Sequence, residues 1–307
     1  MVGILLGHLA GAPGIVSGQS KPDSPYRRIV QGEITVYCVQ EDLLFGKEIL
    51  SLIQSEIPRL DPRLGLRAIP RVHVLIAESD QTFNRVTASA IPDWGIGAAD
   101  PGSGFIFIKS PRYAGSEDRM HSVVRHELVH VLAGSMTSGY EVPRWFDEGL
   151  AQVLSEERSL RFSFRLARSV QARDLIRLDE IDEVLTFQKQ RAALAYETAY
   201  SAVDYLIQTH GESTIAIILQ QLGKGRSMRE ALLAATGLTL GDFESAWREE
   251  MRSRYRWAFV INFPFLISAS FVLLFLAAYW MTKRRAFEKR QLWERESIHD
   301  EETAALD

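Results

Sequence analysis

The sequence predicts an α+β fold, in which a small mixed β-sheet in the N-terminal half precedes a mainly helical half and one transmembrane helix. Short apolar, β-branched runs bounded by turn residues occur before residue 110, as expected of strands. From residue 117 to residue 256, apolar residues recur mainly at three- and four-residue spacing, as in amphipathic helices. An uncharged apolar stretch then covers residues 258–281, which is long enough to cross a bilayer as a helix.

The N-terminal segment, residues 1–20, is interpreted as a possible signal segment. Val2–Val16 is mostly apolar and ends among small residues, as in a signal peptide core and its cleavage region, although no basic residue precedes Lys21. Residues 21–33 are polar and contain proline, which indicates a linker. We therefore expect the main folded domain to span residues 34–256.

Four strands and a helix are expected in the first part of this domain. Ile34–Cys38 alternates in polarity and is rich in β-branched residues, whereas Asp42–Ile57 has helical spacing. Val72–Ala77 is almost wholly apolar, which favours a central strand. Gly95–Ala99 and Phe105–Lys109 flank an Asp-Pro-Gly-Ser-Gly turn sequence and therefore form a predicted hairpin.

The next helix carries the most informative motif of the chain, His-Glu-Leu-Val-His. Ser116 is placed to cap the N-terminus of this helix and Gly134 to end it, so the motif falls in its middle. Residues four apart lie on one helical face, and His126 and His130 can therefore bind the same metal ion. Glu127 lies one position round the helix, where it can polarise a metal-bound water without ligating the metal.

A second helix is expected to supply the third ligand. Pro143 suits its first turn, and Glu148 lies in its middle among apolar packing residues. Two histidines and one glutamate, with an open fourth position, are the ligand set of a catalytic zinc site. His121 precedes His126 by five residues, roughly 140° round the helix, and is a poor ligand candidate. The sequence therefore predicts one Zn²⁺ per chain.

The remaining segments complete the predicted order of elements. Tyr196–Leu206, Thr214–Leu222 and Ala231–Phe243 have helical patterns and continue the helical half. Residues 257–282 form the expected transmembrane helix, and residues 283–307 a charged tail. Basic residues on the two sides of this helix nearly balance, and the apolar N-terminal segment favours an extracytoplasmic catalytic domain at the cell membrane.

The two segments HELVH and WFDEGLAQ resemble those of the gluzincin metallopeptidases, specifically the peptidase-MA-like branch. The resemblance extends over about Ile34–Arg256 and is most specific in the two helices that carry these segments. It implies a zincin-like fold, in which His126, His130 and Glu148 are zinc ligands. It also implies that Glu127 is the general base that activates a zinc-bound water.

The resemblance implies roles for three further features. Related gluzincins hold extended peptides on an edge strand before the metal helix, and Gly95–Ala99 is either that strand or a plain edge strand. A tyrosine or histidine of the helical half helps to bind the oxyanion. Tyr200 is our first candidate for this role and Tyr196 our second, although either could simply pack. Gln152 stands where thermolysin-like gluzincins have an Asp that bonds a ligating histidine.

The predicted function is hydrolysis of peptide bonds in peptide or protein substrates by a membrane-anchored zinc metallopeptidase. The Gly-x-Met-Glu-Asn motif of aminopeptidases is absent before HELVH, which favours an endopeptidase. A catalytically inactive zincin-fold membrane protein, used for binding or scaffolding, is the alternative.

Composition and charge exclude other classes of function. The net charge of −4 gives no overall field that would attract nucleic acid. Cys38 is the single cysteine, which excludes an intramolecular disulfide and a cysteine-based zinc site. Its place in a predicted strand is typical of a small buried residue.

Overall fold

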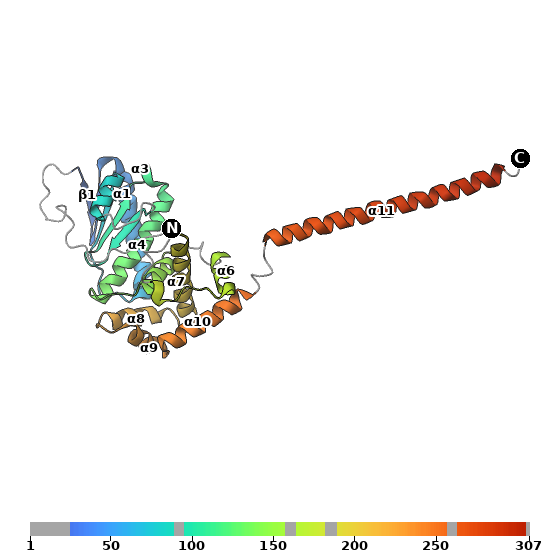
Figure 1. Cartoon of the computed structure of the whole chain (residues 1–307). Coiled ribbons are helices and arrows are strands. Elements are labelled where there is room, and N and C mark those ends of the chain that lie inside the picture. The colour runs from blue at the N-terminus through green and yellow to red at the C-terminus, as the bar shows by residue number, and fades with distance from the viewer. Residues whose placement is uncertain (1–24, 89–94, 157–163, 182–188, 257–262, 305–307) are drawn as a thin grey trace. The chain divides into compact units, whose positions relative to one another are not determined.

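The computed structural model describes residues 25–88, 95–156, 164–181, 189–256 and 263–304 (Figure 1). The chain divides into two compact units, Met1–Arg252 and Ser253–Asp307. The possible signal segment, residues 1–20, lies outside the described residues. The described part of the first unit has a small mixed sheet followed by a mainly helical remainder, which confirms the predicted α+β class.

The sheet has five strands in the order β1-β2-β3-β5-β4. The outer pairs, β1 with β2 and β4 with β5, are antiparallel, whereas β2, β3 and β5 run parallel. The strands span Arg27–Gln31 (β1), Ile34–Cys38 (β2), Val72–Ala77 (β3), Gly97–Asp100 (β4) and Phe105–Lys109 (β5). All four strands predicted from the sequence are therefore present, and β4 lies at an edge of the sheet.

Strand β1 corrects the prediction that residues 21–33 form a linker. Arg27–Gln31 pairs antiparallel with Ile34–Cys38 along its whole length. The tight turn between them is possible because Gly32 adopts a left-handed conformation with φ of +57°, which glycine reaches without steric cost. The two strands form a hairpin, and the Cys38 side chain at its end is fully buried.

Helices cover both faces of the sheet. Alternate residues such as Val36, Val74 and Ile106 face helix α1 (Leu43–Leu64) and helix α4 (Glu117–Thr137), which pack against the sheet. The opposite face includes Leu75 and Phe105, which cluster with Phe83 of helix α2. The short helices of this half are η1 (Gln40–Asp42), α2 (Asp80–Val86) and α3 (Pro111–Ala114).

Helix α4 continues beyond its predicted end. It runs to Thr137, and Ser138 ends it with φ of +54°. Gly134, expected as the stop, lies inside the helix. A side chain at this position would clash, because its Cβ would be 2.3 Å from Cβ of Pro101. Glycine here allows the β4–β5 turn to approach the helix closely. The expected cap at Ser116 is present as the N-cap residue, but its side chain makes no capping hydrogen bond.

The helical half of the first unit packs around α5 and α7. Gly149 of α5 lies against α7, where a Cβ would be 2.4 Å from the carbonyl oxygen of Ala199. Gly237, with φ of +77°, ends α9 and separates it from α10, so the segment expected as Ala231–Phe243 is divided. The helices are α5 (Arg144–Leu154), α6 (Phe164–Ala172), α7 (Lys189–His210), α8 (Ser213–Leu222), α9 (Met228–Thr236) and α10 (Leu240–Arg254).

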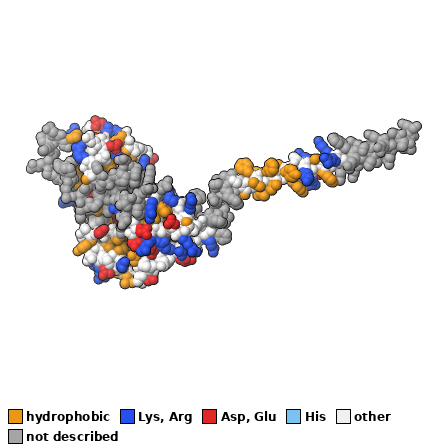
Figure 2. All heavy atoms as spheres, viewed as in Figure 1, with side chains coloured by type: hydrophobic (Ala, Val, Ile, Leu, Met, Phe, Trp, Pro, Cys, Tyr) orange, Lys and Arg blue, Asp and Glu red, His pale blue; other side chains and the backbone are white. Residues whose placement is uncertain are grey.

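The second unit contains helix α11 (Phe263–Ala304). In the coloured part of this helix, Figure 2 shows hydrophobic side chains first and Lys and Arg side chains further along. The helix continues without a break into the expected charged tail, residues 283–307. Among the residues described, no helix is both long and apolar enough to cross a membrane, so the transmembrane helix expected over residues 257–282 is not supported.

Candidate metal centre

Helices α4 and α5 bring the three predicted ligands together. The Nε2 atoms of His126 and His130 lie 3.5 Å and 3.8 Å from Oε2 of Glu148. One ligand atom of each residue lies within 4.8 Å of the others. His130 and Glu148 have no exposed surface, and His126 is only 2% exposed. The two histidines are one turn apart on α4, and the glutamate faces them from the middle of α5.

The distances from the two histidines to Glu148 are close to those of a tetrahedral metal site. With metal–ligand distances of about 2.0–2.1 Å, neighbouring ligand atoms in such a site lie about 3.3 Å apart. The two distances to Glu148 exceed this value by only a few tenths of an ångström. Among the described residues, Nε2 of His130 and both carboxylate oxygens of Glu148 are buried without a hydrogen-bond partner. Buried polar atoms without partners are costly unless they bind something, and a cation would satisfy these atoms together.

Asp147 contacts one of the candidate ligands, a neighbour that the sequence interpretation missed. Its Oδ2 atom lies 2.9 Å from Nδ1 of His130. Burial alone would lower the pKa of His130, but the charge and hydrogen bond of Asp147, together with the charge of Glu148, outweigh it and raise the pKa. A proton held on Nδ1 leaves the Nε2 lone pair directed to a metal. The signal was an acidic residue in an apolar helix, because a buried carboxylate requires a partner.

The role of Gln152, which stands where thermolysin-like gluzincins have an Asp, was left open by the sequence. Its side-chain amide donates to the backbone carbonyl of Glu148, at 2.9 Å. The carboxylate that contacts a candidate ligand histidine therefore comes from Asp147, the residue before Glu148. His121 is also outside the cluster, as predicted, because it stacks on Phe45 and lies 3.7 Å from Glu48.

Glu127 is fully buried beside the candidate ligands. Burial raises the pKa of its carboxyl group to about 7, with the charges of Glu148 and Asp147 acting in the same direction and the two histidines opposing them. Edge strand β4 passes next to this carboxylate, because a Cβ on Gly97 would lie 3.2 Å from Oε1 of Glu127. The predicted small-residue edge strand thus lies alongside the predicted base.

Tyr196, one of the two tyrosine candidates, interacts electrostatically with the site. Burial raises the pKa of its hydroxyl well above the usual value, and the negative charges of Glu148 and Glu127 raise it further against the opposing charge of Arg144. Ala199, three residues further along α7, faces α5. Tyr196 lies on this side of α7. Tyr200 is also buried, one turn further along the same helix.

A cavity of about 940 Å³ opens beside the ligands. His130 and Asp147 contribute to its wall, together with the β4–β5 turn and the segment that joins α4 to α5. Its volume lies within the range of about 300–1,000 Å³ typical of ligand pockets. The cavity therefore adjoins the candidate metal cluster on the side of His130 and Asp147.

The family model of the Peptidase MA superfamily matches residues 53–253, which include α4, α5 and α7. The chain belongs to the Peptidase MA superfamily. Among curated proteins, none matches the chain. Membership of the Peptidase MA superfamily supports a peptidase, and the buried cluster of His126, His130 and Glu148 supports dependence on a metal.

Proposed function

We propose that this protein is a zinc-dependent endopeptidase. The observation that carries the proposal is the buried group of His126, His130 and Glu148, with the carboxylate of Glu127 beside it. Two imidazoles and one carboxylate in a tetrahedral arrangement suit zinc, and three protein ligands leave one position for chemistry. Bound zinc would polarise the scissile carbonyl and make water nucleophilic at neutral pH.

Glu127 is the general base in this proposal. Its carboxylate accepts a proton from the attacking water and later returns the proton to the leaving amine. Proton transfer in both directions is most efficient when the pKa of the base lies near the working pH, and burial brings the pKa of Glu127 to about 7. The absence of a hydrogen-bond partner among the described residues leaves both of its oxygens available.

Tyr196 and strand β4 are proposed to bind the substrate. The Tyr196 hydroxyl keeps its proton because its pKa is raised, and it can donate a hydrogen bond to the oxyanion. Tyr196 therefore replaces Tyr200 as our first candidate for this role. The main chain of an extended peptide can pair with the outer edge of β4, next to Glu127. The extracytoplasmic location of the catalytic unit stays a prediction.

The decisive experiment measures zinc content and peptide hydrolysis in the purified full-length protein. Wild type is expected to contain one zinc per chain and to cleave a mixed peptide library at internal bonds. Glu127→Gln should keep the zinc and lower kcat by at least about 1,000-fold, because it removes the base and keeps the ligands. Glu148→Ala should lose the zinc.

Three outcomes would contradict the proposal. Zinc without cleavage by wild type would favour the inactive binding protein instead. Full activity of Glu127→Gln would exclude that residue as the base. Full zinc occupancy of Glu148→Ala would remove it from the ligand set.

A further inference from the structure

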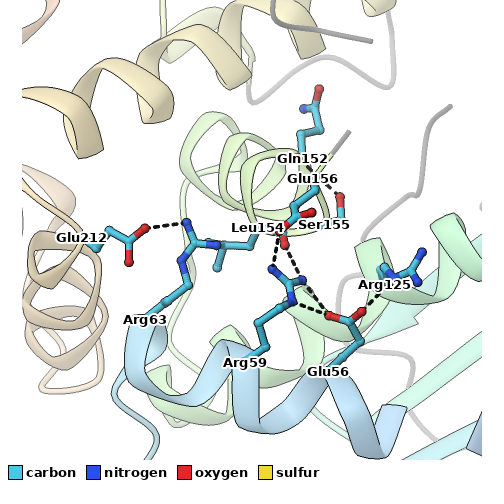
Figure 3. Close-up of polar contacts among 9 residues, drawn as sticks. All are labelled: Glu56, Arg59, Arg63, Arg125, Gln152, Leu154, Ser155, Glu156 and Glu212. Atoms are coloured by element: carbon cyan, nitrogen blue, oxygen red, sulfur yellow. Dashed lines mark hydrogen bonds and ion pairs between the residues drawn. The ribbon is translucent and has the colours of Figure 1, made fainter. Parts of the chain in front are cut away.

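A group of polar contacts joins helix α1 to both helices that carry the metal ligands (Figure 3). Its centre is the carboxylate of Glu56, a residue of α1 that is only 9% exposed. One oxygen of this carboxylate accepts from Nε of Arg125 at 2.8 Å, and the other accepts from Nε of Arg59 at 2.7 Å. Charge-assisted hydrogen bonds of this length are among the stronger polar contacts in proteins.

Arg125 connects this carboxylate to α4 at a defined place. It immediately precedes His126, the first candidate ligand. A hydrogen bond at Arg125 therefore restrains the rotation and the height of α4 at the turn that presents His126.

Arg59 connects the same carboxylate to the end of α5. Its Nη2 atom donates to the carbonyl oxygen of Leu154 at 2.8 Å, and its Nη1 atom donates to Glu156 at 3.1 Å. Leu154 is the last residue of α5, where carbonyl groups lack partners within the helix and the helix dipole favours a cation. Arg59 thus caps the helix that presents Glu148.

We propose that Glu56 and Arg59 are positioning residues that hold α4 and α5 at the separation that metal binding requires. The α1 brace consists of Glu56, Arg59 and Arg125, whose described side-chain contacts are with one another and with the end of α5, not with the side chains of the candidate ligands. It acts through the two helices, and it fixes His126 relative to Glu148 before a metal binds. The inference rests on the proposed metal site, because it concerns the affinity of that site.

The chemistry of the brace indicates how it should fail. Glu56→Gln leaves two guanidinium groups facing a neutral amide that can accept only through its single oxygen, so they repel each other and α4 and α5 lose their common anchor. Sites tolerate displacements of only about 0.5 Å before function suffers. Loss of the brace should therefore weaken metal binding even if the helices remain folded.

A second ion pair on the same helix provides a matched control. Arg63 lies one turn after Arg59, and its Nη2 atom is 2.8 Å from Oε1 of Glu212. Glu212 stands at the start of α8, which carries no candidate ligand. Arg63→Met removes the same kind of side chain from α1 as Arg59→Met, but it leaves α4 and α5 connected.

The test measures the dissociation constant for zinc in full-length wild type, Glu56→Gln, Arg59→Met and Arg63→Met, by competition with a chromophoric chelator. Melting temperature and far-UV circular dichroism of the metal-free proteins are recorded in parallel. Glu56→Gln and Arg59→Met should weaken zinc binding by about five- to tenfold, at the lower end of the effects seen for groups that orient metal ligands. Arg63→Met should change the zinc dissociation constant by less than about twofold. It should lower the melting temperature about as much as Arg59→Met does.

The possible results separate the brace from the proposed function. Wild-type affinity in both Glu56→Gln and Arg59→Met would overturn the brace alone, as would an equal loss in Arg63→Met. Failure of wild type to bind zinc would overturn the proposed function and the brace with it. If Glu56→Gln proves too unstable to fold, Arg59→Met makes the same test.

Discussion

Two buried tyrosines, Tyr196 and Tyr200, lie one turn apart on α7. Tyr196 is influenced by the charges of Glu148 and Glu127, and its raised pKa keeps the phenol protonated at neutral pH. A neutral phenol donates a hydrogen bond, whereas a phenolate would repel a developing oxyanion. The two tyrosines can therefore be distinguished by removing one hydroxyl at a time.

Tyr196→Phe should lower kcat by about 100-fold with zinc content unchanged, because loss of one oxyanion donor typically costs 10²–10³ in kcat. Tyr200→Phe, the matched control on the same helix, should keep kcat within about threefold of wild type. Steady-state kinetics with one peptide substrate measures both. The reverse pattern would assign the role to Tyr200, as first predicted from the sequence.

The sequence was sufficient to predict site residues whose relative positions follow from their spacing within one helix. His126 and His130 share a helical face by virtue of their separation, and this held in the structure. Asp147 could not be found in this way, because its contact with His130 depends on how α5 is rotated relative to α4. That rotation is set by packing between helices, which spacing within one helix does not record.

Helix α5, which carries Glu148, lies very close to α7 at Gly149. Gly149 makes this approach possible, because a Cβ there would be 2.4 Å from a backbone oxygen and 2.7 Å from Cγ2 of Val203. Backbone oxygen atoms cannot turn aside as a flexible side chain can, so the two helices would have to separate.

Gly149→Ala should therefore destabilise the protein by about 1–3 kcal/mol, despite the higher helix propensity of alanine. Chemical denaturation monitored by circular dichroism measures this change. Gly241→Ala, in helix α10, serves as the control. The nearest atom to its added Cβ is Oγ1 of Thr239, at 3.9 Å, which is an ordinary contact distance. That variant should be neutral or slightly stabilised. Equal stability of Gly149→Ala and wild type would show that the α5–α7 contact is looser than described.

Elements with strong periodicity were predicted well, and their ends were predicted less well. The strand Val72–Ala77 and the helix that carries HELVH were found at their expected places. The end of α4 was wrong because a glycine inside a helix can serve a close contact as well as a stop. Strand β1 was missed because its partner, and not its own composition, stabilises it.

For the whole first unit, the metal is expected to contribute to stability. The ligands come from two helices, and a bound ion would stabilise the folded chain over the unfolded one. At a free zinc concentration of about 100 times the dissociation constant, this linkage contributes about 2.7 kcal/mol.

The predicted fold class followed from the order of strands and helices in the sequence. The cavity and the α1 brace could not be predicted in this way, because they depend on the tertiary arrangement of those elements.

Removal of zinc by a chelator should lower the melting temperature by about 5–10 °C, and added zinc should restore it. Differential scanning calorimetry of the full-length protein measures the shift. Glu127→Gln should show the same shift as wild type, whereas Glu148→Ala should show none. An unchanged melting temperature in wild type would indicate that the metal-binding cluster is empty in the untreated protein.

The single thiol of the chain has a practical consequence for such experiments. Cys38 is fully buried, and burial, with a smaller contribution from the charge of Asp42, raises its pKa to about 11. Only thiolates react readily with alkylating reagents, so the native protein should remain unlabelled at neutral pH. A cysteine introduced at an exposed position, for example on the outer face of α8, would then carry a fluorophore or spin label selectively. A label on α8, which packs against α4, could thus report spectroscopically on changes in its surroundings without first removing a native cysteine.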